Sequence, residues 1–410
     1  MLHKCNNEEE IRGPVRPERN LGIGAPDEAF MKDIVALHRA EFEEYPQIVA
    51  TAPGVVKLLG EQTPSAAGLV LAAAITFDVS VAISERRDSS LRFFAADLGE
   101  RKRTGASALK FKKEDRWANY PKAILERFGR TGSVTRGLNI TIAGEVPLGL
   151  GFASSTALLL ATTMALKSHF GVQLRNDEVA DFAFKAESEF FGTPARIDDF
   201  LVSACSTPHA ATIVDLRSAR RHSLPFFDGD WAVVLTDSKV PRLSLVNEEA
   251  QRDTSARQAL ALLDPTGRKS LRDFPPEEIE ELMGQLPESV RRRALHLAEE
   301  YRRVKEAEQT LVEGDKATFG RILARSHTSL RNLYEVSCPE IDWLQKRATE
   351  TEGILCSRLT GPGFGGCTVS IMKREAVDEY RQRLEEYERI FGFRPAVYET
   401  GLEGSMRVID

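Results

Sequence analysis

A glycine-rich segment that leads into an apolar stretch carries the clearest sign of chemistry in this sequence. It reads EVPLGLGFASSTAL over residues 145–158. Gly149 and Gly151 lack the Cβ atoms that would keep a ligand away from the backbone. Ser154 and Ser155 stand where the helix is expected to begin, and there backbone amides bind phosphate and a serine hydroxyl can ligate Mg²⁺. The segment therefore predicts an anion site, with a glycine turn and a serine N-cap as the structural alternative.

A second glycine-rich segment, RLTGPGFGGCTV, occupies residues 358–369, and four of six consecutive residues in it are glycine. Glycine tolerates positive φ, so this pattern indicates a folded-over loop pressed close to a ligand or to another part of the backbone. A tight turn between two strands is the structural alternative. Two such loops on two domains would face one another across a cleft, which is where nucleotide sites tend to form.

The composition limits the classes of function. With 410 residues, of which 42% are hydrophobic, the chain is long enough for two domains. A net charge of -6 leaves no basic excess for nucleic-acid binding, and no apolar run of about 18 residues predicts a membrane span. The five cysteines lack any C-x-x-C pair, so neither disulfides nor a zinc site is expected and a reducing, cytoplasmic setting fits best.

Hydrophobic periodicity predicts two α+β domains behind a loose tail of residues 1–20. The polar stretch 218–230 is the expected boundary, so the domains would span residues 21–225 and 226–410. Residues 69–83 are expected to form one strand or a pair of strands. The other expected elements are the helices 34–42, 157–170 and 177–191, long charged helices between 247 and 342, and the strands 55–59, 138–142, 231–237, 354–359, 367–372 and 395–399.

Three segments, in this order, resemble the GHMP kinases and within them the galactokinase family. They are APGVVKLLGEQT (52–63), VPLGLGFASSTAL (146–158) and RLTGPGFGGCTV (358–369). The segments RWANYPKAI (116–124) and SHTSLRNLYEVSCPEID (326–342) are similar to galactokinase sequences nearly residue for residue. Motifs of independent chemistry thus recur in one order along most of the chain.

The resemblance implies an N-terminal domain like ribosomal protein S5 domain 2, a C-terminal ferredoxin-like domain, and ATP between them. The first loop would wrap the triphosphate, and the second loop would support the nucleotide from the other domain. Ser155 and Glu187 match the magnesium-ligating residues of the family. The implied ATP-binding residues are Gly149, Gly151, Ala153, Ser154, Ser155, Gly361, Gly363 and Gly365.

The catalytic acid is implied by the segment AESEFFGTPARIDDF (186–200), which fits the family pattern A-E-H-x-F-x-G-x-P-x-G-I-M-D without gaps. Asp199 falls on the catalytic aspartate, and Asp198 is the competing choice because a slip of one residue exchanges the two. A carboxylate near the sugar hydroxyl takes or orients its proton, while Mg²⁺ and loop amides stabilise charge on the transferring phosphoryl group. The structural alternative is that the two adjacent acids cap a helix.

The sugar-binding part of the family pattern is altered. Val55 stands where the family has an arginine beside the catalytic aspartate, and a valine cannot stabilise that carboxylate. Lys57, two residues on, points to the same side of an extended strand and is a candidate replacement. Glu61 is kept, whereas Gln62 replaces a histidine and Pro64 replaces the sugar-binding acid.

The family pattern is altered at two further positions. Arg196 stands where a glycine backbone approaches the sugar in the family, and Glu249 stands where a tyrosine is expected. The candidate substrate-binding residues are Lys57, Glu61, Gln62, Arg196 and Asp198.

Two functions compete for this chain, and the first is an ATP- and Mg²⁺-dependent kinase that phosphorylates galactose or a related sugar or polyol. The alternative is a catalytically impaired, galactokinase-like nucleotide- and sugar-binding or regulatory protein, as the changes at Val55, Pro64 and Arg196 suggest. A third hypothesis is a kinase for an anionic substrate held by Arg196 and Lys57. The sequence leaves the oligomeric state open.

Overall fold

The computed structural model describes residues 28–63, 66–107, 109–133, 136–193, 195–227, 229–240, 246–267 and 269–409. The side chains of residues 28–33, 246, 247, 249 and 250 are not described within these ranges. The expected tail of residues 1–20 and the substituted Pro64 lie outside the described residues, as does the side chain of Glu249.

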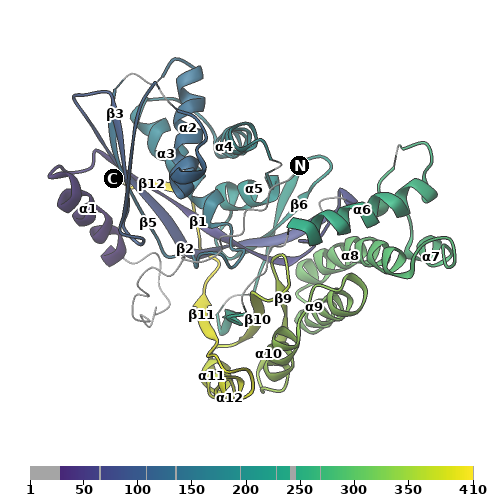
Figure 1. The fold of residues 1–410 in the computed structure, drawn as a ribbon. Coiled ribbons are helices and arrows are strands. Elements are labelled where there is room, and N and C mark those ends of the chain that lie inside the picture. Colours follow the sequence, from purple (N-terminus) through teal and green to yellow (C-terminus); the bar gives the residue numbers. More distant parts are fainter. Residues whose placement is uncertain are drawn as a thin grey trace.

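Two sheets organise the described part of the chain. The larger one is eight-stranded with the order β12-β1-β2-β5-β3-β4, while β6 pairs with β2 and β7 with β6 (Figure 1). All of its pairs are antiparallel except the parallel pair of β3 and β5. Its strands are β1 (Ile48–Leu59), β2 (Leu69–Glu85), β3 (Ser90–Ala95), β4 (Glu100–Gly105), β5 (Leu138–Gly144), β6 (Ala210–Asp215), β7 (Arg221–Pro225) and β12 (Arg407–Ile409).

The run expected to form one strand or a pair of strands is a single strand of 17 residues, β2. Its first part, Leu69–Ala72, pairs with β6, and its last part, Val79–Glu85, pairs with β5. Almost every residue of β2 is buried because helices cover both faces of the sheet where it passes. This explains why the sequence shows a continuous apolar run in place of an alternating one.

Helices cover the larger sheet on both faces (Figure 1). The helix α1 packs on one face of the sheet, against Ala82 and Ala143. The neighbouring residues Val81 and Ile142 point to the opposite face, into the main core. On the core side, α3 is buried all round from Thr156 to Leu166, which its apolar sequence requires. The helices are α1 (Glu28–Phe42), α2 (Asn119–Arg130), α3 (Ser154–His169), α4 (Asn176–Phe191) and α5 (Ile197–Cys205).

The smaller sheet is antiparallel with the order β11-β8-β10-β9, and its helices lie beside and below it in Figure 1. Its strands are β8 (Trp231–Asp237), β9 (Ile354–Thr360), β10 (Cys367–Lys373) and β11 (Ala396–Thr400). Its helices are α6 (Val246–Leu263), α7 (Pro276–Glu280), α8 (Glu288–Glu313), α9 (Lys316–Ser329), α10 (Pro339–Thr349), α11 (Val377–Arg383) and α12 (Glu385–Phe391).

The chain passes from the larger to the smaller sheet between β7 and β8. The polar stretch expected to be a boundary therefore contains a strand, β7, in which only Leu224 is buried, so its sequence lacks the apolar alternation of a strand. We propose a domain division near residue 225. After the smaller sheet the chain returns to the larger one, where β12 pairs with β1 through Thr51 and Arg407.

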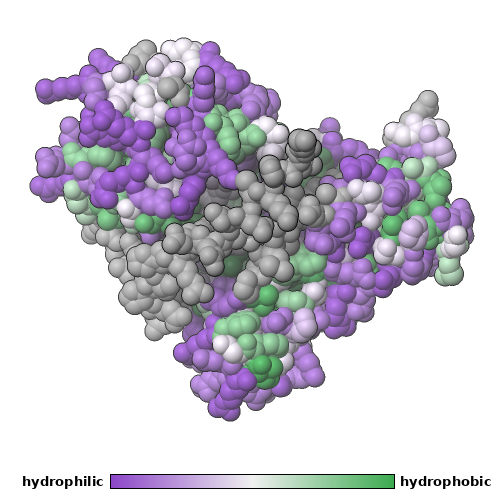
Figure 2. All heavy atoms as spheres, in the orientation of Figure 1, coloured by the Kyte–Doolittle hydropathy of each residue, from purple (hydrophilic) through white to green (hydrophobic). Residues whose placement is uncertain are grey.

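The surface drawn in Figure 2 is mainly hydrophilic, with apolar residues in small separate groups. The described part of the chain holds no helix that is long and apolar enough to cross a membrane.

Candidate functional site

Strand β1 brings a cation to the two candidate acids. The ammonium group of Lys57 lies 2.5 Å from Oδ1 of Asp199 and also bonds Oδ2 of Asp198. Both acids lie in the first turn of α5, and neither caps the helix by a side-chain hydrogen bond. The Oγ of Ser203 in the same helix donates to the carbonyl of Pro53 at 2.6 Å, which fixes α5 on β1. The acids therefore pair with a neighbouring strand, and the helix-cap alternative does not describe them.

Arg196 is the second cation of this cluster. Its NH2 lies 3.1 Å from Oδ2 of Asp198, and its NH1 donates to the carbonyl of Glu61 at 2.9 Å. The two acids differ in accessibility, since Asp198 is 1% exposed and Asp199 is 14% exposed. Asp198 is thus enclosed between two cations, whereas Asp199 keeps one side open.

The charges in this cluster alter the proton affinities. Burial alone would raise the pKa of Asp198, but the positive charges of Lys57 and Arg196 lower it. Burial opposes the charge on Arg196, yet the carboxylates of Asp198 and Asp199 raise the pKa of its guanidinium. Burial first, and then the charge of Asp199, raises the pKa of Glu187 to about 7. Among the described residues, no positive charge lowers the pKa of Glu187 in the way that Lys57 and Arg196 lower the pKa of Asp198.

The first glycine-rich loop docks on β1 at the start of the same site. The amide of Val55 donates to the carbonyl of Phe152 at 3.0 Å. A Cβ atom on Gly54 would lie 2.9 Å from that carbonyl oxygen, so a glycine is needed for this close approach. Gly149 and Gly151 both have positive φ, and the helix α3 begins directly afterwards.

The N-terminus of α3 differs from the serine-capped alternative. Its N-cap residue is Ala153, in the left-handed conformation with φ 57, and it carries no side-chain cap. Ser154 and Ser155 are the first two helical residues. The hydroxyl of Ser155 hydrogen-bonds Tyr120 of α2, whose pKa is raised by burial and then by the charge of Glu187. Ser155, Tyr120 and Glu187 therefore share one corner of the site.

The second glycine-rich loop connects β9 to β10, and its four glycines all have positive φ. A Cβ atom on Gly363 would lie 2.6 Å from the carbonyl of Val336, and one on Gly365 would lie 2.9 Å from Cβ of Val240. Close packing on neighbouring backbone thus explains these two glycines. Gly361 faces the other half of the molecule, because its carbonyl accepts a hydrogen bond from the Gln62 side chain at 3.0 Å.

The bend that follows β1, residues 60–63, is called the β1 bend below. Glu61 in this bend is 2% exposed, and its Oε1 pairs with the buried Arg358 at 2.6 Å. Arg358 also donates to the carbonyl of Leu58. The Oε2 of Glu61 is buried without a hydrogen-bond partner among the described residues. Glu61 therefore has one carboxylate oxygen that no described residue satisfies.

Several residues that shape the site were not among the sequence candidates. Arg358 opens the second glycine-rich segment and Tyr120 lies in RWANYPKAI, so both were within quoted motifs. Their roles depend on partners far along the chain, and no local pattern announces such a contact.

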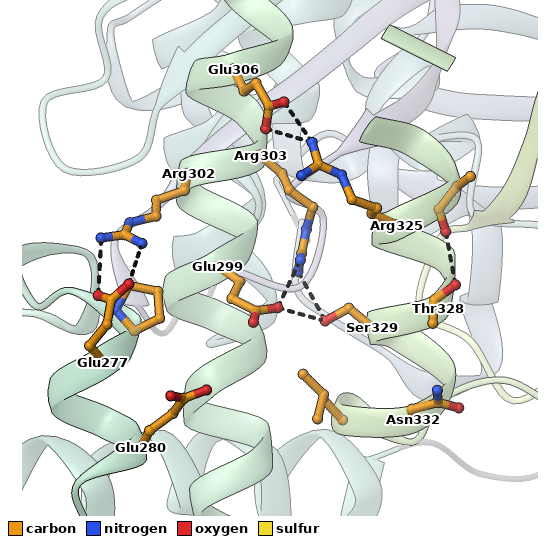
Figure 3. Close-up of a pocket in the computed structure, with 13 residues that line it drawn as sticks. Glu277, Glu280, Glu299, Arg302, Arg303, Glu306, Arg325, Thr328, Ser329 and Asn332 are labelled. Atoms are coloured by element: carbon orange, nitrogen blue, oxygen red, sulfur yellow. Dashed lines mark hydrogen bonds and ion pairs between the residues drawn. The ribbon is translucent and has the colours of Figure 1, made fainter. Parts of the chain in front are cut away.

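A separate groove of 820 Å³ lies on the outer side of α8 and α9 (Figure 3). None of the candidate catalytic, ATP-binding, metal-binding or substrate-binding residues lines it. Its arginines are paired with neighbouring acids, as Arg302 is with Glu277 and Arg325 with Glu306.

The chain is similar to known proteins in its family models, its sequence and its fold. Three family models match: the GHMP kinases N terminal domain over residues 119–207, the galactokinase galactose-binding signature over 36–85, and the GHMP kinases C terminal model over 307–389. The chain is 34% identical to a galactokinase of Roseiflexus over 89% of this chain and 94% of that protein. It is 33% identical to a galactokinase of Homo sapiens, over 85% and 90% of the two chains. The structure of Lactococcus lactis galactokinase complexed with galactose aligns with a TM-score of 0.85 at 25% identity, covering 92% of this chain and 99% of that one.

Proposed function

Because the chain belongs to the galactokinase family of the GHMP kinases, we propose that it transfers the γ-phosphoryl group of ATP to a hydroxyl of galactose or of a related sugar or polyol. The two-domain α+β kinase fold that the sequence indicated is confirmed. The observation that carries the proposal is the ion pair between Lys57 and Asp199, since it supplies the cation that Val55 lacks.

We assign the catalytic acid to Asp199. Of the two candidates, Asp199 is the more accessible, and it is the one whose charge reaches Glu187 on the nucleotide side. The ammonium of Lys57 pairs with the Asp199 carboxylate and would orient it, so that it can accept or orient the proton of a substrate hydroxyl. Asp198 is enclosed by Lys57 and Arg196 and would hold those cations in place.

The donor set fits Mg²⁺. Ser155 and Glu187 offer a hydroxyl and a carboxylate beside Tyr120, and Mg²⁺ prefers oxygen ligands with few protein contacts and several waters or phosphates. Among the described residues, no cluster of three or more acidic, histidine or cysteine side chains is suited to a metal. A Mg²⁺ ion held mainly by phosphates and waters does not require such a cluster. A bound Mg²⁺ would offset the repulsion between Glu187 and Asp199 and neutralise charge on the phosphates.

The nucleotide is proposed to bind at the N-terminus of α3. Ser154 and Ser155 there point their amides toward the loop, and Ala153 provides no side-chain cap that would compete with a phosphate. Gly149 and Gly151 give the loop its shape. The loop of Gly361, Gly363 and Gly365 would close the site from the other domain, where its contact with Gln62 ties it to the β1 bend.

The sugar is proposed to lie against the β1 bend, close to Asp199. The Oε2 of Glu61, which has no hydrogen-bond partner among the described residues, is suited to accept a substrate hydroxyl, and the partly exposed side chain of Arg196 is suited to donate to one. An anionic substrate is disfavoured, because the two cations Lys57 and Arg196 are already balanced by the two carboxylates Asp198 and Asp199.

A location in the cytoplasm is part of this proposal. The four cysteines in the described residues, Cys205, Cys338, Cys356 and Cys367, are all free thiols, which fits a reducing compartment.

The test is turnover of Mg-ATP by the purified protein with galactose, other monosaccharides, sugar acids and polyols, with Asp199→Ala as the control. Galactose or a related neutral sugar should be phosphorylated, and Asp199→Ala should remove the activity. Binding of ATP without turnover of any of these compounds would favour the regulatory alternative instead.

A further inference from the structure

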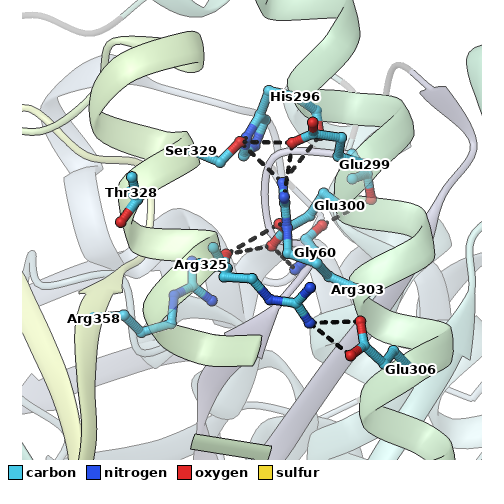
Figure 4. Close-up of polar contacts among 12 residues, drawn as sticks. Gly60, His296, Glu299, Glu300, Arg303, Glu306, Arg325, Thr328, Ser329 and Arg358 are labelled. Atoms are coloured by element: carbon cyan, nitrogen blue, oxygen red, sulfur yellow. Dashed lines mark hydrogen bonds and ion pairs between the residues drawn. The ribbon is translucent and has the colours of Figure 1, made fainter. Parts of the chain in front are cut away.

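We propose that Glu300 of α8 is a positioning residue that holds the β1 bend in place for the sugar. This inference rests on the proposed function and adds to it a residue that lies in the C-terminal half of the chain. Figure 4 shows the Glu300 carboxylate between Arg303 and Gly60, at the junction of the two halves of the molecule.

The contact with the bend is direct. The backbone amide of Gly60 donates to Oε1 of Glu300 at 3.1 Å. Gly60 has φ +84, and a Cβ atom there would lie 2.0 Å from the carbonyl of Leu69, so only glycine can direct its amide this way. The next two residues are Glu61 and Gln62, and any shift of Gly60 would displace both of them.

The carboxylate of Glu300 is itself fully used. Its Oε2 accepts from Nε of Arg303 at 2.7 Å, and the hydroxyl of Ser326 donates within 3.0 Å of both oxygens. Burial opposes the charge, but chiefly Arg303 offsets it and lowers the pKa of Glu300 to about 2. Glu300 is 1% exposed, so this is a buried and fully charged clamp on a single backbone amide.

The clamp gives a role to the motif SHTSLRNLYEVSCPEID, which the proposed chemistry does not use. Ser326 binds Glu300, and Ser329 accepts from NH2 of Arg303 at 3.0 Å while also bonding Nδ1 of His296 at 2.9 Å. His327, which lies between Ser326 and Ser329 in the sequence, accepts a hydrogen bond at its Nδ1 from the amide of Leu359 at 3.2 Å. The motif therefore supports Arg303 and Glu300 on one side and the strand β9 on the other.

Other contacts hold the neighbouring backbone from the same half of the molecule. Thr360 donates to the carbonyl of Lys57 at 2.9 Å, and Arg358 binds both Leu58 and Glu61. Thr360 and Arg358 belong to the strand β9, whereas Glu300 belongs to the helix α8. Glu300 binds the amide of Gly60, which lies in the chain between Lys57 and Glu61.

The decisive variant is Glu300→Gln, compared with Arg302→Gln on the same helix. Glutamine has one acceptor oxygen, so its NH₂ group must face either Arg303 or the Gly60 amide, and both are donors. Arg302 bonds Glu277 on the groove side, at 3.1 and 3.2 Å, and serves as the matched control. We expect Glu300→Gln to raise KM for the sugar about tenfold with KM for ATP within about twofold, and Arg302→Gln to change neither.

Ser326→Ala removes one donor to Glu300 and leaves Arg303 in place, so it should raise the sugar KM by about threefold. This milder variant serves if Glu300→Gln fails to fold, which its melting temperature will show. A folded Glu300→Gln protein with an unchanged sugar KM would overturn the proposal. Equal rises in both KM values would do the same, because they would indicate a general structural role.

Hydrogen exchange separates this inference from the proposed function. Mass spectrometry of the peptide covering residues 57–63 should show about tenfold faster exchange in Glu300→Gln than in Arg302→Gln or the unaltered protein. If the unaltered protein phosphorylates no sugar, the proposed function fails, yet the exchange measurement still tests the clamp. Unchanged exchange in Glu300→Gln would show that Glu300 does not hold the bend.

Discussion

The ammonium nitrogen of Lys57 lies 2.5 Å from Oδ1 of Asp199, so β1 itself supplies a cation to the carboxylate proposed to act on the sugar. The family arginine is absent at Val55, which is fully buried. Side chains two residues apart on a strand share a face, and Lys57 therefore approaches α5 from the side on which an arginine at position 55 would lie. The partner on α5 has changed as well, because Asp198 stands where the family pattern has methionine and pairs with Lys57.

Removal of this cation should reduce catalysis. We expect Lys57→Met to lower kcat by about 10²-fold or more, because the site loses the cation that pairs with Asp199 and would stabilise charge on the transferring phosphoryl group. The buried Asp198 also loses a partner, so the melting temperature should fall. The double variant Lys57→Met/Asp198→Met removes that buried charge and should regain stability without regaining kcat. Recovery of kcat in the double variant would mean that Lys57 only neutralises Asp198.

The two neighbouring acids should differ in their effects. Asp199→Asn should lower kcat by about 10² to 10⁴-fold, since an amide cannot take a proton from the sugar hydroxyl. Asp198→Asn should keep most of the activity, because it touches Lys57 and Arg196 and is enclosed by them. Steady-state rates with the preferred sugar measure both variants, and the opposite ranking would make Asp198 the catalytic acid.

His38 should make stability depend on pH. Its Nδ1 bonds Thr141 and its Nε2 bonds Ser84, and burial lowers its pKa from 6.5 to about 4. Between pH 4 and pH 6.5, His38 is therefore protonated in the unfolded chain and neutral in the folded protein. Stability is therefore fully present above pH 6.5 and is lost as the pH falls toward 4, by about 2 to 3 kcal/mol.

Urea unfolding at pH 7 and pH 4.5 measures this loss. Other buried groups contribute to the total, so the comparison is with His38→Gln, which does not titrate. A variant that loses as much stability on acidification as the unaltered protein would exclude His38 as the source.

Gly54→Ala should weaken ATP binding more than sugar binding. The new Cβ would lie 2.9 Å from the carbonyl of Phe152 and 3.1 Å from both γ carbons of Val146, so the first glycine-rich loop, which is proposed to bind the nucleotide, must move. A cost of about 1 to 2 kcal/mol corresponds to a rise of roughly 5- to 30-fold in KM for ATP. Gly105→Ala is the control, because no atom lies within 4 Å of its added Cβ. Equal KM values for the two variants would show that the loop does not depend on Gly54.

Periodicity predicted many of the buried elements, but it missed the buried strands β3 and β6 as well as the exposed strands β4 and β7. The helices α3 and α4 and the strands β5, β8, β9 and β10 lie where the apolar patterns placed them. The strand β4 was missed because its sequence, ERKRTG, is charged and its residues alternate between half-buried and exposed. Strands with one solvated face and an open edge carry little of the apolar signal on which such predictions depend.

The sequence could predict those residues of the candidate site that lie within recognisable motifs. Lys57 and Asp199 were found because each lies in a recognisable segment, and strand geometry suggested that they would meet. The partners of the β1 bend could not be found in this way. Arg358 lies 297 residues from Glu61, and Glu300 lies 240 residues from Gly60. Such pairs are created by the packing of the two halves and leave no trace in local spacing.

The short strand β12 has a consequence for how this protein is made. Its residues Arg407–Ile409 pair with Val49–Thr51 of β1, at the edge of the larger sheet, and Arg407 also reaches Asp78 of β2 at 3.4 Å. The ribosome releases these residues after every other described strand, so the edge of β1 at Val49–Thr51 stays open until they emerge. A nascent chain therefore cannot close this edge of the larger sheet before the residues of the smaller sheet have also been synthesised.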